Sequence, residues 1–307
     1  MGLKTWLGLK KNVQKPKIMK KATKKSNPYA SHTVKYWPVD LAEEWRGPIV
    51  TFGISLKSAT VSNDWDQTQI LLGGTLRSIF RQSDPRWRVI ICGHEMPDIP
   101  EMADRRVEFV ASEHRPPQGG VGRLARADKY RKRFIIGERL RSLGGGYFMA
   151  LDADDLLHRD LVATGLATQH GCLITTGYIF DAASNAIAPM PGVLSVDFDR
   201  ICGSMAIIQH EQEDFPQSWN DEAFASHFGR LMSHGYARGI QEESGRPLSI
   251  VPFPAAIYVT NTGENITYID KRRDGRSCLA SMVQAHAITD PQKLDEIADH
   301  FGWRSNP

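Results

Sequence analysis

Three aspartates at the end of a short apolar run have the clearest chemical potential in this chain. Residues 147–151 are apolar, and Asp152, Asp154 and Asp155 follow them. The run predicts a buried strand, and its alternating side chains would place Asp152 and Asp154 on one face. Two such carboxylates repel each other unless a cation lies between them, and their hard oxygens suit Mg²⁺ or Mn²⁺. The spacing therefore predicts a metal site at Asp152 and Asp154 that could hold a diphosphate. Alternatively, Asp154 or Asp155 caps a helix that begins near Leu156.

The elements in front of the aspartates predict how they are positioned. Hydrophobic spacing predicts strands over 48–56, 87–92 and 106–111, and helices over 67–82 and 123–143. Strands that alternate with helices indicate an α/β fold with a parallel sheet, in which ligands bind outside the carboxyl ends of the strands. The acidic residues lie at such an end, and so does Ser55.

After residue 170 the pattern changes to a mixed half. Strands are expected over 172–180, 193–199, 205–209 and 250–260, and helices over 219–233 and 291–301. A doubly wound half followed by a mixed half is typical of a nucleotide-binding half joined to an acceptor-binding half.

Composition limits the class of protein. The chain has 307 residues and four scattered cysteines, with no Cys-x-x-Cys pair, so a zinc site is not expected. No apolar run approaches the length that spans a bilayer, and no secretory signal is evident, which favours a cytoplasmic protein.

The N-terminal 36 residues differ from the rest in charge. They carry ten lysines and no acidic residue, and without them the chain has 28 basic against 35 acidic residues. Residues 1–46 are therefore expected to form a flexible tail. It could be a solvated leader, an arm for nucleic acid, or a peripheral contact with the anionic inner membrane. For the chain as a whole, nucleic acid is not an expected partner.

The acidic segment resembles a known family. The stretch 139–161, with Leu-Asp-Ala-Asp-Asp at 151–155, is similar to the metal-binding region of GT-A-fold glycosyltransferases of the family-2-like kind. The span 48–267, about 220 residues, is similar more specifically to a bacterial group described as rhamnosyl transferases. The resemblance implies a GT-A-type, Rossmann-like and mostly parallel sheet flanked by helices, with a mixed acceptor-binding half. A domain over 47–270, divided at 160/161, is expected from it. Residues 271–307 lie outside the resemblance, and the residue pattern predicts a helical extension there.

The resemblance also implies roles for the acidic residues and for the helix before them. Asp154 would coordinate a metal that bridges the donor's phosphates, and Asp152 would contact the ribose or the metal. Asp155 would orient its neighbours or line the donor pocket. Arg123 and Lys129, at the start of a basic helix, would contact the diphosphate, which a helix dipole also favours; the alternative is a solvated basic face.

Two further roles are implied beyond the acidic strand. Asp221 or Glu222 would be the base that deprotonates the acceptor hydroxyl, unless they are simply first-turn carboxylates of a helix. Asn261 stands near the place where many relatives carry a metal-binding His, and a plain turn is the alternative there.

The implied function is transfer of a sugar from a nucleotide-diphosphate donor to an acceptor hydroxyl, with inversion and with Mn²⁺ or Mg²⁺ as cofactor. The enzyme would be a hexosyl- or deoxyhexosyltransferase in polysaccharide biosynthesis, with rhamnose as one candidate sugar. Its acceptor would be a glycan, a lipid-linked saccharide or a small molecule. One alternative is a nucleotidyltransferase of related fold, although residues 55–61 lack the glycine that such an enzyme needs. Another is a catalytically inactive nucleotide- or sugar-binding module.

Overall fold

The computed structural model describes residues 47–118, 122–217, 221–265 and 275–302. The strands are β1 Val50–Ser55, β2 Trp87–Gly93, β3 Val107–Ala111, β4 Gly145–Leu151, β5 Leu156–Leu157, β6 Gly171–Leu173, β7 Gly177–Asp181, β8 Ala186–Met190, β9 Ala206–Glu211, β10 Ser249–Ile250 and β11 Ala256–Thr260. The helices are α1 Trp65–Phe80, α2 Gly122–Ser142, α3 Leu161–Leu166, α4 His227–Arg230, α5 Ala237–Glu243, α6 Gly275–Ala285 and α7 Pro291–Phe301. The 3₁₀ turns are η2 Pro100–Ala103, η3 Phe198–Arg200, η4 Gln212–Asp214 and η5 Asp221–Ala225.

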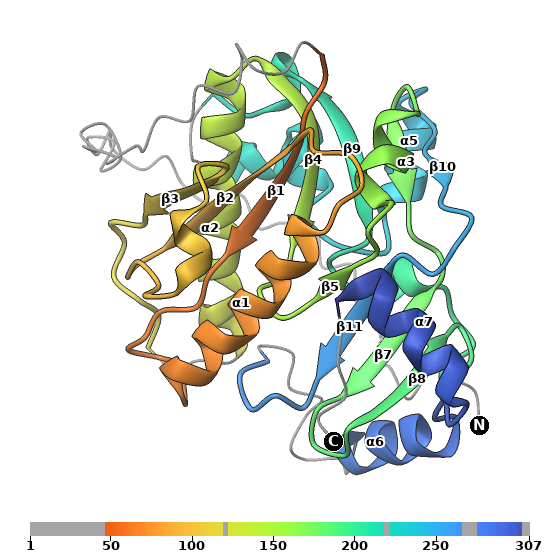
Figure 1. Ribbon diagram of the computed structural model, residues 1–307. Coiled ribbons are helices and arrows are strands. Elements are labelled where there is room, and N and C mark those ends of the chain that lie inside the picture. The colour runs from red at the N-terminus through yellow and green to blue at the C-terminus, as the bar shows by residue number, and fades with distance from the viewer. Residues whose placement is uncertain (1–46, 119–121, 218–220, 266–274, 303–307) are drawn as a thin grey trace, which may run out of the picture. The chain divides into compact units, whose positions relative to one another are not determined.

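Seven of the strands form one mostly parallel sheet in the order β10-β6-β9-β4-β1-β2-β3. Strand β9 runs antiparallel to both of its neighbours, β4 and β6, and the other pairs in this sheet are parallel. The predicted α/β fold class, with a mostly parallel sheet flanked by helices, is confirmed (Figure 1).

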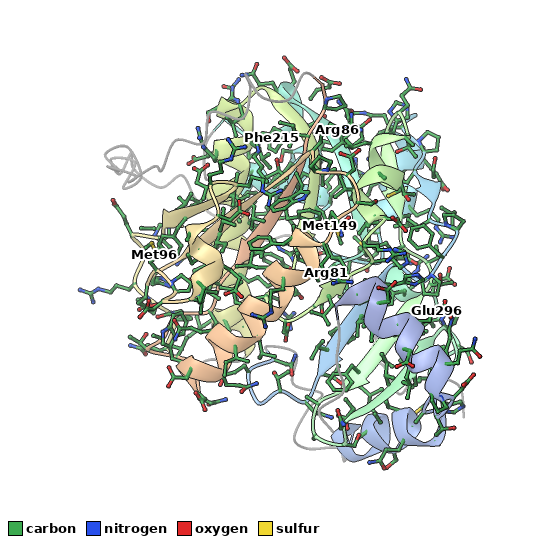
Figure 2. All side chains as sticks on the ribbon, viewed as in Figure 1. Arg81, Arg86, Met96, Met149, Phe215 and Glu296 are labelled. Carbon is green, nitrogen blue, oxygen red and sulfur yellow. The ribbon has the colours of Figure 1, made fainter. Side chains whose placement is uncertain are left out.

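The two long helices cover opposite faces of this sheet. Leu72 and Leu76 of α1 pack in the same cluster as Phe52 and Met149, whereas Phe134 of α2 packs in a second cluster with Phe228 and other residues of the opposite face. Strand residues alternate between the two clusters, as the pleat requires. Figure 2 shows Met149 inside the packed strands and Met96 at the periphery.

A smaller sheet has the order β5-β11-β7-β8. Strand β8 is at its edge, which suits Pro189, because proline cannot donate a hydrogen bond to a further strand. Ile297 and Phe301 of α7 pack on this sheet against Tyr178 and Ile187.

The strand order places a switch point beside the acidic residues. From β1 the chain proceeds to β2 and β3 on one side and then returns to β4 on the other. A crevice forms outside the carboxyl ends of two strands at such a point. Here these ends are Ser55 of β1 and the Asp152 turn after β4.

Three predicted strands are corrected by the structure. The expected strand 172–180 is two strands, β6 and β7, which belong to different sheets, and 250–260 is likewise divided between β10 and β11. Prolines at 252 and 254 interrupt the latter run. Residues 193–199 form no strand, and the strand in this region is β8.

Two predicted helices are also corrected. The segment after the aspartates is strand β5, and the next helix, α3, begins only at Leu161. The described part of 219–233 is broken into η5 and α4 instead of being one helix. The predicted N-terminal tail lies outside the described residues. None of the described helices combines the length and the apolar character needed to cross a bilayer.

Candidate active site

A cavity lies at the switch point, next to the acidic turn. Its polar wall includes Ser55, Lys57, Lys129, Asp152, Asp154, Glu264 and Asn265. The cavity encloses about 80 Å³, well below the roughly 300 Å³ of a complete small-molecule site. A cation or a phosphate group would fit inside it, and a larger ligand would extend outside.

Asp152 is held between two cations at the cavity wall. Its Oδ1 lies 2.6 Å from Lys129 Nζ and 3.4 Å from Arg133 Nη2. Gly203 makes room for this arrangement, since a Cβ there would lie 3.3 Å from the Asp152 carboxylate. Burial alone would raise the pKa of Asp152, but Lys129 and Arg133 hold it below its ordinary value. Asp152 is therefore ionised, with its charge largely compensated.

Asp154 faces the same cavity in a different electrostatic setting. Its Oδ2 accepts a hydrogen bond of 2.7 Å from Asn265 Nδ2. Within the described residues, no lysine, arginine or histidine forms an ion pair with Asp154. Burial and the carboxylates of Asp155 and Asp152 raise the pKa of Asp154 well above its ordinary value. Asp154 is thus a carboxyl group on the wall whose negative charge has no cationic partner among the described residues, and a divalent cation could supply one.

Asp155 lies behind the turn, fully buried, and does not line the cavity. Its Oδ2 accepts hydrogen bonds from Ser204 Oγ at 2.6 Å and Cys202 Sγ at 3.1 Å, and its Oδ1 accepts one from Val259 N at 3.2 Å. Burial and the Asp152 charge raise its pKa to about 7. Ser204 Oγ also accepts a hydrogen bond from Asp152 N, so these contacts fix the backbone of the acidic turn.

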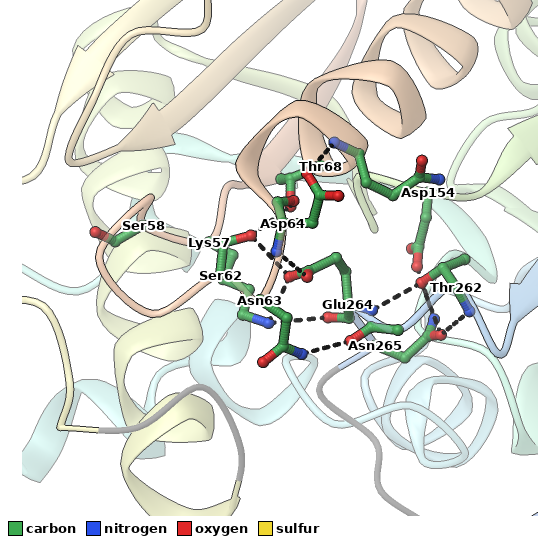
Figure 3. A network of polar contacts seen from close by, with 12 residues as sticks. Lys57, Ser58, Ser62, Asn63, Asp64, Thr68, Asp154, Thr262, Glu264 and Asn265 are labelled. Carbon is green, nitrogen blue, oxygen red and sulfur yellow. Dashed lines mark hydrogen bonds and ion pairs between the residues drawn. The ribbon is translucent and has the colours of Figure 1, made fainter.

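The opposite wall is built from two loops joined by Glu264. Its carboxylate accepts hydrogen bonds from Lys57 Nζ at 2.8 Å, Ser62 Oγ at 2.9 Å and Asp64 N at 2.8 Å. Figure 3 shows this network between the loop after β1 and the loop after β11. Burial alone would raise the pKa of Glu264, but its hydrogen bonds with Lys57 and Ser62 hold it below the ordinary value.

The loop after β11 contributes a different asparagine from the predicted one. Asn261 adopts a left-handed backbone conformation, and its Nδ2 donates to Asp181 rather than facing the acidic turn. Asn265 reaches Asp154 instead, and Thr262 fixes its amide by donating to Oδ1 from both N and Oγ1. Both asparagines stand in one short loop, so sequence alone could not tell which of them reaches the turn.

The remaining predicted residues fall into two groups. Ser55 lines the cavity beside Lys129, and its Oγ donates to the Lys129 carbonyl at 3.2 Å. Arg123 is exposed at the start of α2 and is not part of the cavity wall. The backbone of Asp221 and Glu222 forms the start of η5, and their side chains lie outside the described structure.

Comparisons with known proteins give only distant likeness. No family model and no curated protein sequence matches the chain. One similar solved structure is that of S. aureus TarS, with 9% sequence identity and a TM-score of 0.38; the match covers 82% of this chain and 42% of TarS. Another is the apo form of glycosyltransferase GlyE from Streptococcus pneumoniae TIGR4, with 8% identity and a TM-score of 0.36; the match covers 77% of this chain and 63% of GlyE. A third is the galactosyltransferase LgtC in complex with donor and acceptor sugar analogs, with 11% identity and a TM-score of 0.32; the match covers 80% of this chain and 99% of LgtC. The chain thus spans less than two thirds of TarS and of GlyE. Likeness at these TM-scores carries no functional argument.

Proposed function

We propose that this chain is a metal-assisted glycosyltransferase of GT-A type that uses a nucleotide-diphosphate sugar. The observation that carries the proposal is the acidic turn at the switch point, where Asp154 faces the cavity without a cationic partner among the described residues. Leu-Asp-Ala-Asp-Asp at this place is also the feature that resembles the metal-binding motif of such enzymes.

The residues of the wall have complementary roles in this function. Asp154, assisted by Asp152, would hold Mg²⁺ or Mn²⁺, and such a metal would neutralise charge on the departing nucleoside diphosphate. Lys129 keeps Asp152 ionised, and its ammonium has two further N–H groups that can donate to a phosphate. Ser55 and the backbone around it would line the nucleotide side.

The acceptor side of the proposal rests on position in the chain. Asp221 or Glu222 would deprotonate the acceptor hydroxyl from the start of η5, giving inversion at the sugar. The acceptor would be a glycan, a lipid-linked saccharide or a small molecule. Rhamnose remains one candidate for the donated sugar.

A thermal-shift panel tests the proposal. UDP, GDP, dTDP and CMP are each added with and without Mn²⁺ to the full chain, to Asp154→Ala and to the surface control Asp295→Asn, which changes an exposed aspartate of α7. We expect one nucleotide to raise the melting temperature only with Mn²⁺, in wild type and the control but not in Asp154→Ala. An equal shift in all three proteins, or none in wild type, contradicts the metal role of Asp154. Pyrophosphate release from a nucleoside triphosphate and a sugar phosphate would favour the nucleotidyltransferase instead.

A further inference from the structure

A second group of ligand-type side chains lies away from the cavity wall. His210 of β9, Asp214 of η4 and His227 of α4 bring one ligand atom each to within 4.8 Å of one another. None of the three belongs to the cavity wall beside Asp154. We call them the His–Asp–His cluster. His210 and Asp214 are buried and His227 is nearly so.

The carboxylate of this cluster is fixed, with one acceptor position left. Arg246 donates to Asp214 Oδ1 through Nη2 at 2.8 Å and to Oδ2 through Nη1 at 2.6 Å. The backbone N–H of Glu211 also donates to Oδ2 at 2.9 Å. A carboxylate oxygen offers two lone pairs. Both of those on Oδ2 are used, whereas Oδ1 accepts one hydrogen bond and keeps one lone pair.

His227 has its tautomer set by a neighbour. Its Nε2 lies 3.0 Å from Gln241 Oε1, and with the amide in this orientation Nε2 donates the proton. Nδ1 then has a lone pair, 3.5 Å from Asp214 Oδ1, and no hydrogen-bond partner among the described residues. Metal-binding histidines typically show this pattern, in which the other ring nitrogen donates to an oxygen.

His210 presents a second unpaired nitrogen to the same carboxylate. The residue is 2% exposed, and Nδ1 lies 3.8 Å from Asp214 Oδ2 without a hydrogen-bond partner in the described structure. A buried ring nitrogen without a hydrogen-bond partner is unfavourable, and a cation bound between these nitrogens and the carboxylate would satisfy them.

We propose that the His–Asp–His cluster binds a divalent transition metal, with Zn²⁺ as the leading candidate. Ligand atoms bonded to one tetrahedral Zn²⁺ at about 2.0–2.1 Å lie roughly 3.4 Å apart. His227 Nδ1 lies 3.5 Å from Asp214 Oδ1, close to that value. The three ligand atoms as a group lie within 4.8 Å of one another, so His210 would approach further to share one ion. Two nitrogens and one oxygen suit zinc and leave a fourth position for water.

The metal would fix the elements behind the acceptor side. It would tie β9 of the large sheet to η4 and α4, and Gln241 would extend the link to α5. The turn η5, which carries Asp221 and Glu222, directly precedes α4. A metal here would therefore hold the segment that follows the proposed base, a role separate from that of the Asp154 site.

Metal binding by the full chain, stripped with EDTA and studied without nucleotide, tests this proposal. Titration with ZnCl₂ is followed by calorimetry and by melting temperature, and CoCl₂ by visible absorption. We expect one equivalent of Zn²⁺ to bind and to raise the melting temperature by several degrees. Co²⁺ should give the absorption of a nitrogen- and oxygen-ligated tetrahedral ion, a readout on wild type that needs no variant.

Variants assign the site and separate it from the proposed active site. His227→Gln should lose the Zn²⁺ equivalent, whereas the exposed control His286→Ala and the cavity variant Asp154→Ala should keep it. If wild type binds no Zn²⁺ at stoichiometric concentration, or if His227→Gln binds it unchanged, the cluster is a metal-free network in which Gln241 is reversed and His227 donates to Asp214. Zn²⁺ binding lost in Asp154→Ala would place the ion at the acidic turn and overturn the assignment.

Discussion

The cavity wall and the region behind it use the same residue type in opposite ways. On the wall, Asp154 is partly exposed, and the side-chain partner that the described part of the chain gives it is Asn265. One residue later, Asp155 is fully buried and accepts three hydrogen bonds. We call Asp155 with its donors Cys202, Ser204 and Val259 the buried anchor. The two adjacent carboxylates of this turn therefore have different roles: Asp154 is available to a ligand, and Asp155 fixes the backbone that positions Asp154.

The strongest test of this division is removal of the anchor carboxylate. Asp155→Ala leaves the Ser204 hydroxyl and the Val259 N–H without their acceptor in the interior, so we expect a loss of about 3 kcal/mol in the free energy of unfolding. Urea denaturation measures it. The protein that remains folded should keep most of its nucleotide affinity. A stable Asp155→Ala protein that binds no nucleotide would reverse the assigned roles.

The complementary change on the wall should affect activity and spare stability. Asp154→Ala removes the proposed metal ligand, so we expect the rate of sugar transfer to fall about 100-fold, equivalent to about 2.7 kcal/mol. Only the Asn265 hydrogen bond is lost from the fold, so the free energy of unfolding should change by about 1 kcal/mol or less. Steady-state kinetics on the identified donor, together with urea denaturation, provide both numbers. Normal turnover of Asp154→Ala would contradict the role of Asp154 as a metal ligand.

The Glu264 network should give an intermediate effect on both readouts. Glu264→Gln removes the charge that pairs with Lys57 and replaces one accepting carboxylate oxygen with a donating NH₂ group. We therefore expect the free energy of unfolding to fall by about 1.5 kcal/mol and nucleotide binding to weaken. Glu296→Gln on α7 is the matched control, because its pairing with Lys293 is exposed. It should leave both readouts unchanged. Equal behaviour of the two variants would show that the network does not shape the cavity.

A pH-dependent effect, small at neutral pH, concerns a buried group that belongs to neither region. Burial and the neighbouring His300 lower the pKa of His158 to about 4. Between pH 6.5 and 4 the unfolded chain therefore binds a proton that the folded chain does not, and stability falls as the pH is lowered. His158→Gln should reduce this slope by the contribution of one group. Melting temperatures across this pH range measure it, and an unchanged slope contradicts the shift.

The sequence predicted the first half of the fold well because its signals are local. Each strand or helix from β1 to β4 was expected within about two residues, since continuous apolar runs and helical spacing define such elements. The second half was harder. Residues 172–180 look like one apolar strand, yet the chain passes from one sheet to the other between Leu173 and Gly177. Similarly, 219–233 has helical spacing but is divided into η5 and α4.

The candidate site shows the same limit. The acidic turn, Lys129 and Ser55 were predicted and lie together on the cavity wall. Asn265, Lys57 and Glu264 were missed, because their partners are far away in sequence and their own surroundings are those of an ordinary turn. Which of Asp154 and Asp155 is buried also depends on Cys202 and Ser204, contacts that no local pattern encodes.

The contact between Glu264 and Lys57 joins residues 207 positions apart. During synthesis, strands β1 to β4 are complete by residue 151, long before the loop after β11 leaves the ribosome. A nascent chain that stops short of residue 264 would have the acidic turn but lack the wall that faces it. The order of synthesis thus delays completion of the cavity wall until residue 264 has been made.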